Sequence, residues 1–268
     1  MKILKSKPFT PGRRHYKYLS KFLLCKYTHF LKNLTFNIRR CVARSSSTGH
    51  TTVWGRSSGC KKLYRQINYL NNPSLGIVLF SFYDPNRTAF VSVYFDFLKY
   101  KFSYILAIEG VGPGAIVASS LNFSNFRLGY RTSLGKHITG SILNSLSLNS
   151  RKPAQYALAA GTFCQLVQKG TQNCRVRLPS NQIITLSSLC FATLGVISNV
   201  SNNLVVLGKA GRNRLKGFRP RVRGIAMNPV DHPHGGRTNG GRAWTTPWGK
   251  PTQNCSTSNS KRKKIYKF

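Results

Sequence analysis

The clearest strand in the sequence is Cys174-Arg-Val-Arg-Leu-Pro179. Basic and apolar residues alternate along it with a period of two, which is typical of a strand with one buried face and one solvated face. Outward from it lie short runs rich in β-branched and aromatic residues, and each run predicts a further strand. These runs are residues 77–83, 91–95, 104–108, 164–167, 183–186, 193–197 and 204–207.

Turn-forming residues separate these runs, at 84–86, 110–114, 179–181 and 199–203. Strands this short and this closely spaced are typical of all-β barrels and sandwiches. No long helical pattern competes, and residues 153–160 offer at most one or two helical turns. A break in the strand pattern near residues 122–131 divides the strands into two sets. We therefore predict two small β-barrels in tandem.

The charge of the chain indicates a polyanionic partner. The 268 residues include 42 Lys and Arg but only 4 Asp and Glu, which gives a formal net charge of +38. Self-repulsion at this level opposes compaction unless a polyanion is present. Residues 1–65 hold no carboxylate and residues 206–268 hold only Asp231. We predict that these basic ends are disordered when the protein is free and become ordered on an anionic partner.

The C-terminal part has the composition of an RNA-binding segment. Residues 208–224 interleave Gly with Lys and Arg, so that the backbone can approach a phosphate chain while guanidinium groups bind it. We expect Arg219, Arg221 and Arg223 to bind phosphates. A Pro- and Gly-rich segment follows, and Trp244 and Trp248 offer faces on which bases can stack.

Catalytic candidates are few, because four carboxylates leave little for acid–base pairs. Asp231-His232 would suit a His oriented by a carboxylate, but no nucleophile motif accompanies it, and we expect both residues to lie in a buried, hydrogen-bonded turn at an RNA surface. Asp84 precedes Pro85, where we expect it to bond nearby backbone. The glycines of residues 110–114 are not followed by the helix that a dinucleotide-binding site needs, so we expect a tight turn there.

The sequence also gives little support for a metal site, a disulfide scaffold or a membrane-spanning helix. His232 and His234 could chelate a metal only with further ligands that the sequence does not cluster, so we expect no metal site. The 7 Cys are odd in number and scattered, which favours free thiols. The apolar runs are shorter than the roughly 18–20 residues of a membrane helix.

Two other function classes remain open at this point. A DNA- or RNA-compacting architectural protein would explain the charge, and it would bind duplex DNA as well as RNA. A hydrolase would use Asp231 and His232, and it would turn over substrate when free of RNA. Neither class accounts for tandem barrels beside the segment that follows Ile225.

That segment carries a family resemblance. Met227-Asn-Pro-Val-Asp-His-Pro-His-Gly-Gly236, followed by Thr246-Pro-Trp-Gly249, resembles the universal large-subunit ribosomal protein two family of the bacterial and organellar type. Further matching segments run along nearly the whole chain. They are residues 7–15, 61–65, 83–87, 104–107, 159–162, 192–195 and 207–211.

The resemblance implies a mainly β fold with an oligonucleotide-binding-type barrel followed by an SH3-like barrel. It divides the chain into a basic N-terminal extension (1–58), the first barrel (59–125), the second barrel (126–205) and a basic Gly/Pro-rich C-terminal extension (206–268). It also implies a structural, non-enzymatic protein that binds large-subunit rRNA. The C-terminal extension is expected to reach toward the peptidyl-transferase region and the subunit interface, with His232 in a positioning or RNA-contacting role.

The implied partners are large-subunit rRNA, other ribosomal proteins and the small subunit through an intersubunit contact. No membrane, no homo-oligomer and no cofactor are expected, apart from structural Mg²⁺ held through rRNA. The expected rRNA-binding residues are Arg13, Arg14, His15, Lys61, Lys62, Arg65, Arg87, Lys209, Arg212, Arg214, Arg219, Arg221, Arg223, Asn228, Asp231, His232, His234, Arg237, Arg242, Trp244, Trp248, Lys261, Arg262, Lys263 and Lys264.

Two segments depart from the family pattern. The Gly-rich loop before Lys61 runs from Thr48 and contains Trp54 and several Ser, and residues 99–109 lack the family's acidic, Gly-containing turn. Asn, Phe, Tyr and Ser are abundant while acids are scarce, a composition that favours an organelle-encoded protein. We expect a mitochondrial ribosome, with a plastid ribosome as the second choice.

Overall fold

The computed structural model describes residues 2–26, 31–37, 43–69, 72–120, 127–149, 152–237, 243–253 and 265–266. The strands are β1 Ile3–Lys5, β2 Lys17–Leu19, β3 Thr35–Asn37, β4 Leu63–Arg65, β5 Ser74–Phe82, β6 Val91–Asp96, β7 Lys101–Leu106, β8 Ile116–Ser119, β9 Arg131–Ser133, β10 Ile142–Asn144, β11 Leu146–Ser147, β12 Ala154–Tyr156, β13 Cys164–Lys169, β14 Asn173–Arg177, β15 Ile183–Ser187, β16 Phe191–Leu194 and β17 Ile265–Tyr266. The helices are α1 Pro11–Arg14 and α2 Ala210–Leu215, with 3₁₀ helices η1 Lys32–Leu34, η2 Leu134–Lys136, η3 Val200–Leu204 and η4 Gly224–Ala226.

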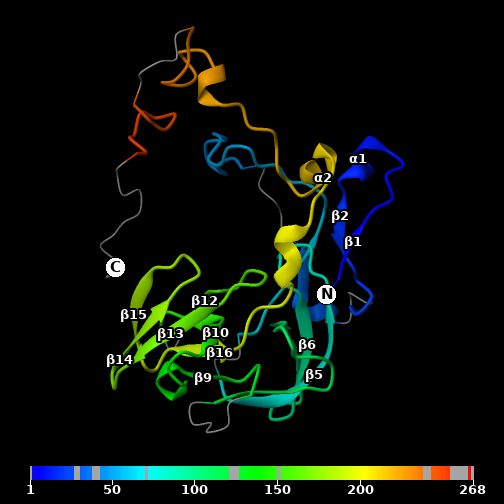
Figure 1. Ribbon diagram of the computed structural model, residues 1–268, viewed down its shortest axis with the longest axis vertical. Coiled ribbons are helices and arrows are strands. Elements are labelled where there is room, and N and C mark those ends of the chain that lie inside the picture. Colours follow the sequence, from blue (N-terminus) through cyan, green and yellow to red (C-terminus); the bar gives the residue numbers. More distant parts are fainter. Residues whose placement is uncertain are drawn as a thin grey trace. The chain divides into compact units, whose positions relative to one another are not determined.

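Eleven strands form one sheet in the order β17-β15-β14-β13-β10-β16-β9-β8-β5-β6-β7. Neighbours pair antiparallel except β8 and β9, which are parallel and meet at Ser119 and Arg131. We call β5–β8 the first barrel and β9–β16 the second barrel. In Figure 1 the second-barrel strands β13, β14 and β15 are green arrows, and β5 and β6 are blue-green. The fold is mainly β, as the sequence predicted.

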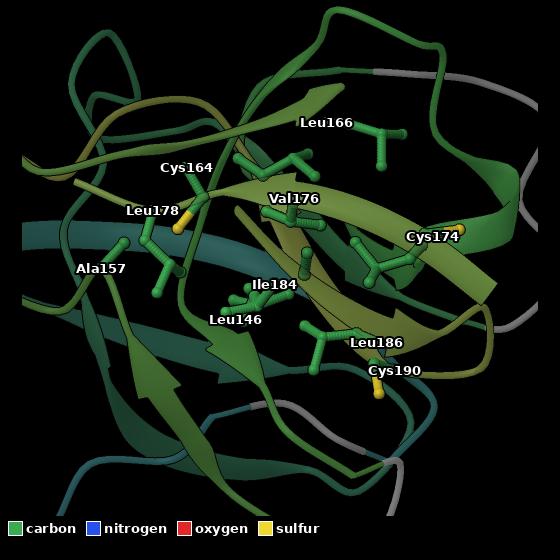
Figure 2. Close-up of a cluster of buried hydrophobic side chains, with 13 residues drawn as sticks. Leu146, Ala157, Cys164, Leu166, Cys174, Val176, Leu178, Ile184, Leu186 and Cys190 are labelled. Carbon is green, nitrogen blue, oxygen red and sulfur yellow. The ribbon is translucent and has the colours of Figure 1, made fainter. Parts of the chain in front are cut away.

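The second barrel encloses the larger core. Along β14 the side chains of Cys174 and Val176 are buried and those of Arg175 and Arg177 are exposed, which confirms the predicted alternation. The residues around them form one apolar cluster, part of which Figure 2 labels. Its buried members are Leu134, Leu143, Leu146, Ala157, Cys164, Leu166, Cys174, Val176, Leu178, Ile184, Leu186, Cys190 and Ala192.

The first barrel has smaller core clusters on its strands. Val78, Tyr94, Ile105 and Val117 form one of them. A second is formed by Phe82, Val91, Val93 and Tyr104, in which the rings of Phe82 and Tyr104 meet edge to face at 5.5 Å. Edge-to-face ring pairs add to the stabilisation that burial gives.

Backbone bonds join the two barrels. The amide of Ser198 donates to the carbonyl of Ala107 at 3.0 Å, and the amide of Glu109 donates to the carbonyl of Val196 at 2.9 Å. The Ser198 hydroxyl accepts the amide of Phe90 at 3.1 Å. Both barrels accordingly belong to one compact unit, which spans residues 1–39, 62–209 and 265–268 and which we call the first unit.

Residues 40–61 and 210–264 make up the second unit, over their described parts. It draws on both of the extensions that the sequence predicted, one that precedes the barrels in the sequence and one that follows them. The expected boundaries after residues 58, 125 and 205 stay predictions. None of the helices in the described part of the chain is long and apolar enough to cross a membrane.

Two local expectations were wrong. Residues 204–207 form no strand, because η3 ends at Leu204 and Val206 makes only an isolated bridge with Lys17. Residues 154–156, where the sequence allowed at most one or two helical turns, form β12, paired with β11. The strand expected at 193–197 lies at Phe191–Leu194, since Gly195 adopts φ +117°, a left-handed value that ends it.

Candidate nucleic-acid interface

In the second unit, residues 55–60 run beside residues 215–219. The amide of Ser57 donates to the carbonyl of Gly217 at 2.9 Å, and that of Cys60 donates to Leu215 at 3.0 Å. The amide of Arg219 donates to Gly55 at 2.9 Å. These bonds tie the segment before β4 to the Gly- and Arg-rich segment after α2.

Gly59 makes this approach feasible. It has φ +64°, and a Cβ at this position would lie 2.7 Å from the Leu215 carbonyl oxygen and 2.8 Å from the Gly217 nitrogen. Any other residue would push the two segments apart. Gly59 therefore allows the two backbone segments to come together.

The expected phosphate-binding arginines begin at the end of this paired segment and continue after it. Arg219, Arg221 and Arg223 are all exposed. Arg221 is held by one nitrogen, because its Nη2 donates to the carbonyl of Trp54 at 3.0 Å. A guanidinium has five N–H donors, so this anchor leaves others for an anion. The structure thus exposes three cationic side chains at and after the end of the paired backbone.

Arg56 was not among the expected residues. Its guanidinium carbon lies 4.2 Å from the ring centroid of Phe218, which is a cation–π contact. Trp54, which is 54% exposed, lies on the same segment. A signal was present in the sequence, since an aromatic residue and an arginine lie two positions apart in the 54–56 stretch.

His232 lies in a buried turn, as predicted. It is 9% exposed, its Nδ1 accepts the amide of His234 at 3.0 Å, and its carbonyl accepts the amide of Gly235 at 2.8 Å. Gly224 lies against its ring, since a Cβ there would be 2.6 Å from the imidazole. Asp231 is exposed. Within the described residues no hydrogen bond or ion pair joins its carboxylate to His232, so a catalytic pair is not formed.

His234 connects this turn to residues 243–245. Its Nε2 lies 2.9 Å from the carbonyl oxygen of Ala243 and 3.2 Å from the amide of Thr245. Trp244 meets the His234 ring edge to face at 6.2 Å and is 62% exposed, while Trp248 is 68% exposed. Both indoles therefore leave faces open to an RNA base, on which stacking is favourable.

Arg65 and Arg87 bind a carboxylate of the chain itself. Arg87 Nε donates to Asp84 Oδ2 at 2.7 Å, and Arg65 Nη1 donates to Oδ1 at 3.3 Å. Asp84 is fully buried and Arg65 is 3% exposed. These contacts hold the buried Arg65 guanidinium and the half-buried Arg87 guanidinium, and the phosphate contacts expected for both side chains stay predictions. Asp84 also accepts the amide of Asn86 at 3.0 Å, the turn contact that the sequence predicted.

The other expected residues fall into three groups. Arg13, Arg14 and His15 are exposed in and after α1, and Lys209 lies beside them, 3.5 Å from where a Cβ on Gly12 would be. The second unit contains further members that are mostly exposed, namely Lys61, Arg212, Arg214, Asn228 and Arg237, while half-buried Lys62 begins the next segment of the first unit. Arg242, Lys261, Arg262, Lys263 and Lys264 lie outside the described residues.

No group of three His, Cys, Asp or Glu that could hold a metal occurs among the residues described. Cys25, Cys60, Cys164, Cys174 and Cys190 are free thiols. Burial raises the pKa of the Cys164 thiol to about 12, which keeps it protonated and unreactive at neutral pH.

Known proteins match this chain over almost its whole length. Residues 31–119 match the family model "Ribosomal Proteins L2, RNA binding N-terminal domain", and residues 127–251 match "Ribosomal Proteins L2, C-terminal domain". The large ribosomal subunit protein uL2 of Dinoroseobacter shibae is 38% identical over 98% of this chain and 94% of its own length. That of Rickettsia felis is 41% identical over 95% of this chain and 94% of its own. The chain belongs to the ribosomal protein L2 family.

Proposed function

We propose that this chain is a structural protein of the large ribosomal subunit and that it binds rRNA mainly through its second unit. The observation that carries the proposal is the paired backbone of residues 55–60 and 215–219, with Arg219 exposed at its end and Arg221 and Arg223 exposed just after it. Cationic side chains on a Gly-rich backbone suit a phosphate chain. Trp244 and Trp248 add exposed rings for unpaired bases.

A non-enzymatic role fits the same residues. The buried carboxylate of Asp84 is engaged by two arginines, and Asp231 lies exposed, apart from the His232 ring. Acid–base catalysis needs a titrating group within hydrogen-bond reach of its partner. The described residues offer no such pair around His232, so RNA binding is a better interpretation of this region than catalysis.

The test is co-sedimentation with the large subunit. The chain should move with the large subunit in a sucrose gradient, and RNase should release it. A variant with Arg219, Arg221 and Arg223 all changed to Gln should bind rRNA with a salt dependence smaller by about 2–3 in slope, at about 0.7–0.9 per lost phosphate contact.

The matched control changes Lys99, Lys101 and Lys136 to Gln, which removes the same charge from exposed side chains of the first unit. Equal losses for both variants would show that net charge alone drives binding. Equal affinity for duplex DNA would instead support an architectural, non-ribosomal role.

We also propose a finer placement. The resemblance over residues 227–236 supports a position of the second unit near the peptidyl-transferase region and the subunit interface, with His232 as a positioning residue. The burial of His232 against Gly224 supports this role, since a ring held so closely shapes the turn around it. His232→Gln should leave the chain in the subunit and slow peptide-bond formation. Unchanged rates in subunits that contain the variant would contradict the role.

The remaining partners follow from the same family. We propose that the chain enters the subunit as one copy, contacts other ribosomal proteins and the small subunit, and needs no cofactor beyond Mg²⁺ held through rRNA. Its abundant aromatic residues (16 Phe and 12 Tyr) and scarce acids support a mitochondrial ribosome, and a plastid ribosome is the alternative. Detection of the chain in ribosomes purified from each organelle would decide between them.

A further inference from the structure

The second barrel carries a cationic surface to which the sequence assigned no RNA contact. Residues 127–205 contain no Asp or Glu, and the expected RNA-binding residues skip from Arg87 to Lys209. Arg175 and Arg177 nevertheless project from the outer face of β14. A surface without carboxylates offers an anion nothing that would repel it.

Arg177 lies in a pocket of about 420 Å³ on this barrel. Phe163 and Gln165 line the same pocket, and Gln165 is the register partner of Arg177 across β13 and β14. Phe163 is 44% exposed, so its ring is accessible to a ligand. The volume falls in the range of small-ligand pockets, which is about 300–1,000 Å³.

Two turns give the pocket a fixed frame. On one side the amide of Gly161 donates to the carbonyl of Ile197 at 3.1 Å, and the hydroxyl of Thr162 donates to that of Ala159 at 2.7 Å. On the other side the amide of Leu178 donates to Gln182 at 2.8 Å, and Asn181 holds a left-handed φ of 64°. Because hydrogen bonds hold both turns in place, a ligand would meet a pocket that is already formed.

The groups that line the pocket match the parts of a nucleotide. An exposed aromatic ring stacks on a base, and a guanidinium binds a phosphate through paired hydrogen bonds. The side-chain amides of Gln165 and Asn181 line the same pocket and can donate to and accept from a base edge. We propose that this pocket binds one unstacked nucleotide of the RNA that the chain contacts, an inference that rests on the proposed function.

A nucleotide fits better than a protein segment. An acidic peptide would satisfy Arg177, but it would leave the two amides and the Phe163 ring without a specific role. An RNA strand with one base turned out of its stack uses all four groups at once. A protein occupant is therefore an outcome of the test.

The test places a photoreactive phenylalanine analogue at position 163 of the full chain, in assembled large subunits. Position 97 is the matched control, because Phe97 is 43% exposed and lies outside the pocket. We expect position 163 to crosslink to rRNA at one nucleotide. Adding Arg177→Gln should lower that yield about tenfold, the loss of an interaction of about 1.4 kcal/mol. Arg175→Gln, the same charge change on the same face of β14, should leave it within about twofold.

The outcomes separate the two proposals. A chain that sediments with the large subunit but gives no RNA crosslink at position 163 overturns the pocket alone. A crosslink to protein at that position, or equal effects of Arg175→Gln and Arg177→Gln, overturns it as well. A wild-type chain that stays out of the large subunit overturns both the pocket and the proposed function.

Discussion

The first and second units of this chain are stabilised in different ways. The first unit buries a broad apolar core in the second barrel and smaller clusters in the first. Among the described residues of the second unit, the buried positions are Gly217, His232 and Gly235, and none is an apolar side chain. Apolar burial is the dominant favourable term in folding. The comparison therefore indicates that the first unit folds by itself, whereas the second depends on its partner.

The partner that the second unit needs is anionic. Its segments are held by backbone bonds around Gly59 and by the Arg221 contact with Trp54, while Lys and Arg point outward. Without apolar burial, these bonds must compete with bonds to water, and each contributes only about 0.5–1.5 kcal/mol. Neutralisation by rRNA phosphate removes the repulsion and provides the missing free energy.

The largest effect on the first unit should come from Asp84→Asn. This change leaves the buried guanidinium of Arg65 without its carboxylate, and breaking a buried ion pair costs about 3–5 kcal/mol. Thermal unfolding followed by circular dichroism should show a clearly lowered midpoint. Asp231→Asn, at an exposed carboxylate of the second unit, is the control and should change stability by less than about 0.5 kcal/mol. Similar midpoints for the two variants would refute the assigned role of Asp84.

Leu166→Ala tests the second-barrel core. Leu166 is fully buried within the cluster, and a large-to-small change at such a site costs about 2–5 kcal/mol. Val167→Ala on the same strand is the control, because Val167 is 42% exposed and should cost far less. Denaturant titration of both variants measures the difference. A loss at position 167 as large as that at 166 would mean that the outer face of β13 is covered.

Gly59→Ala tests the second unit without touching the barrels. The added Cβ clashes with the Leu215 carbonyl oxygen, and the left-handed φ adds a strain of about 1–3 kcal/mol. We expect weaker rRNA binding together with an unchanged unfolding midpoint of the barrels. Gly49→Ala is the control, since Gly49 also has a positive φ but no atom near its Cβ position. A lowered barrel midpoint for Gly59→Ala would contradict the independence of the two units.

The smallest effect should be a pH dependence of the second barrel. Burial lowers the pKa of His137, and the Nε2 atom of this residue lies 3.0 Å from the hydroxyl oxygen of Thr132. The unfolded chain therefore binds a proton more readily than the folded chain, and stability is lost as the pH falls below about 6.5. His137→Gln should flatten the decline of the unfolding midpoint between about pH 7 and 5. His15→Gln, at an exposed His, should leave the decline unchanged.

Much of the fold could be predicted because the alternation of apolar and polar residues along a strand is visible in the local sequence. The alternation of residues 174–178 needs only local information, and it fixed both the strand and its buried face. Residues 204–207 misled for the opposite reason. Their β-branched side chains favour a strand, but η3 and the contact of Val206 with Lys17 depend on residues almost two hundred positions away.

In the candidate site too, local features could be predicted and contacts between distant segments could not. The segment 227–236 could be recognised from its own residues, and the turn around His232 followed. The engagement of Arg65 and Arg87 by Asp84 could not be predicted, because a basic residue that binds phosphate and one that binds a carboxylate look alike in sequence. The meeting of residues 55–60 with 215–219 was equally hidden, since nothing local to either segment specifies it.

The most direct test of the difference between the two units is hydrogen exchange of backbone amides, measured on the full chain when free and within the large subunit. Exchange reports the free energy of local opening. We predict that residues 72–120, 127–149 and 152–205 are protected in both states. Residues 43–61 and 210–237 should exchange rapidly in the free chain and slowly in the subunit. Slow exchange of the second unit in the free chain would contradict the account, because it would show that this unit holds its structure without rRNA.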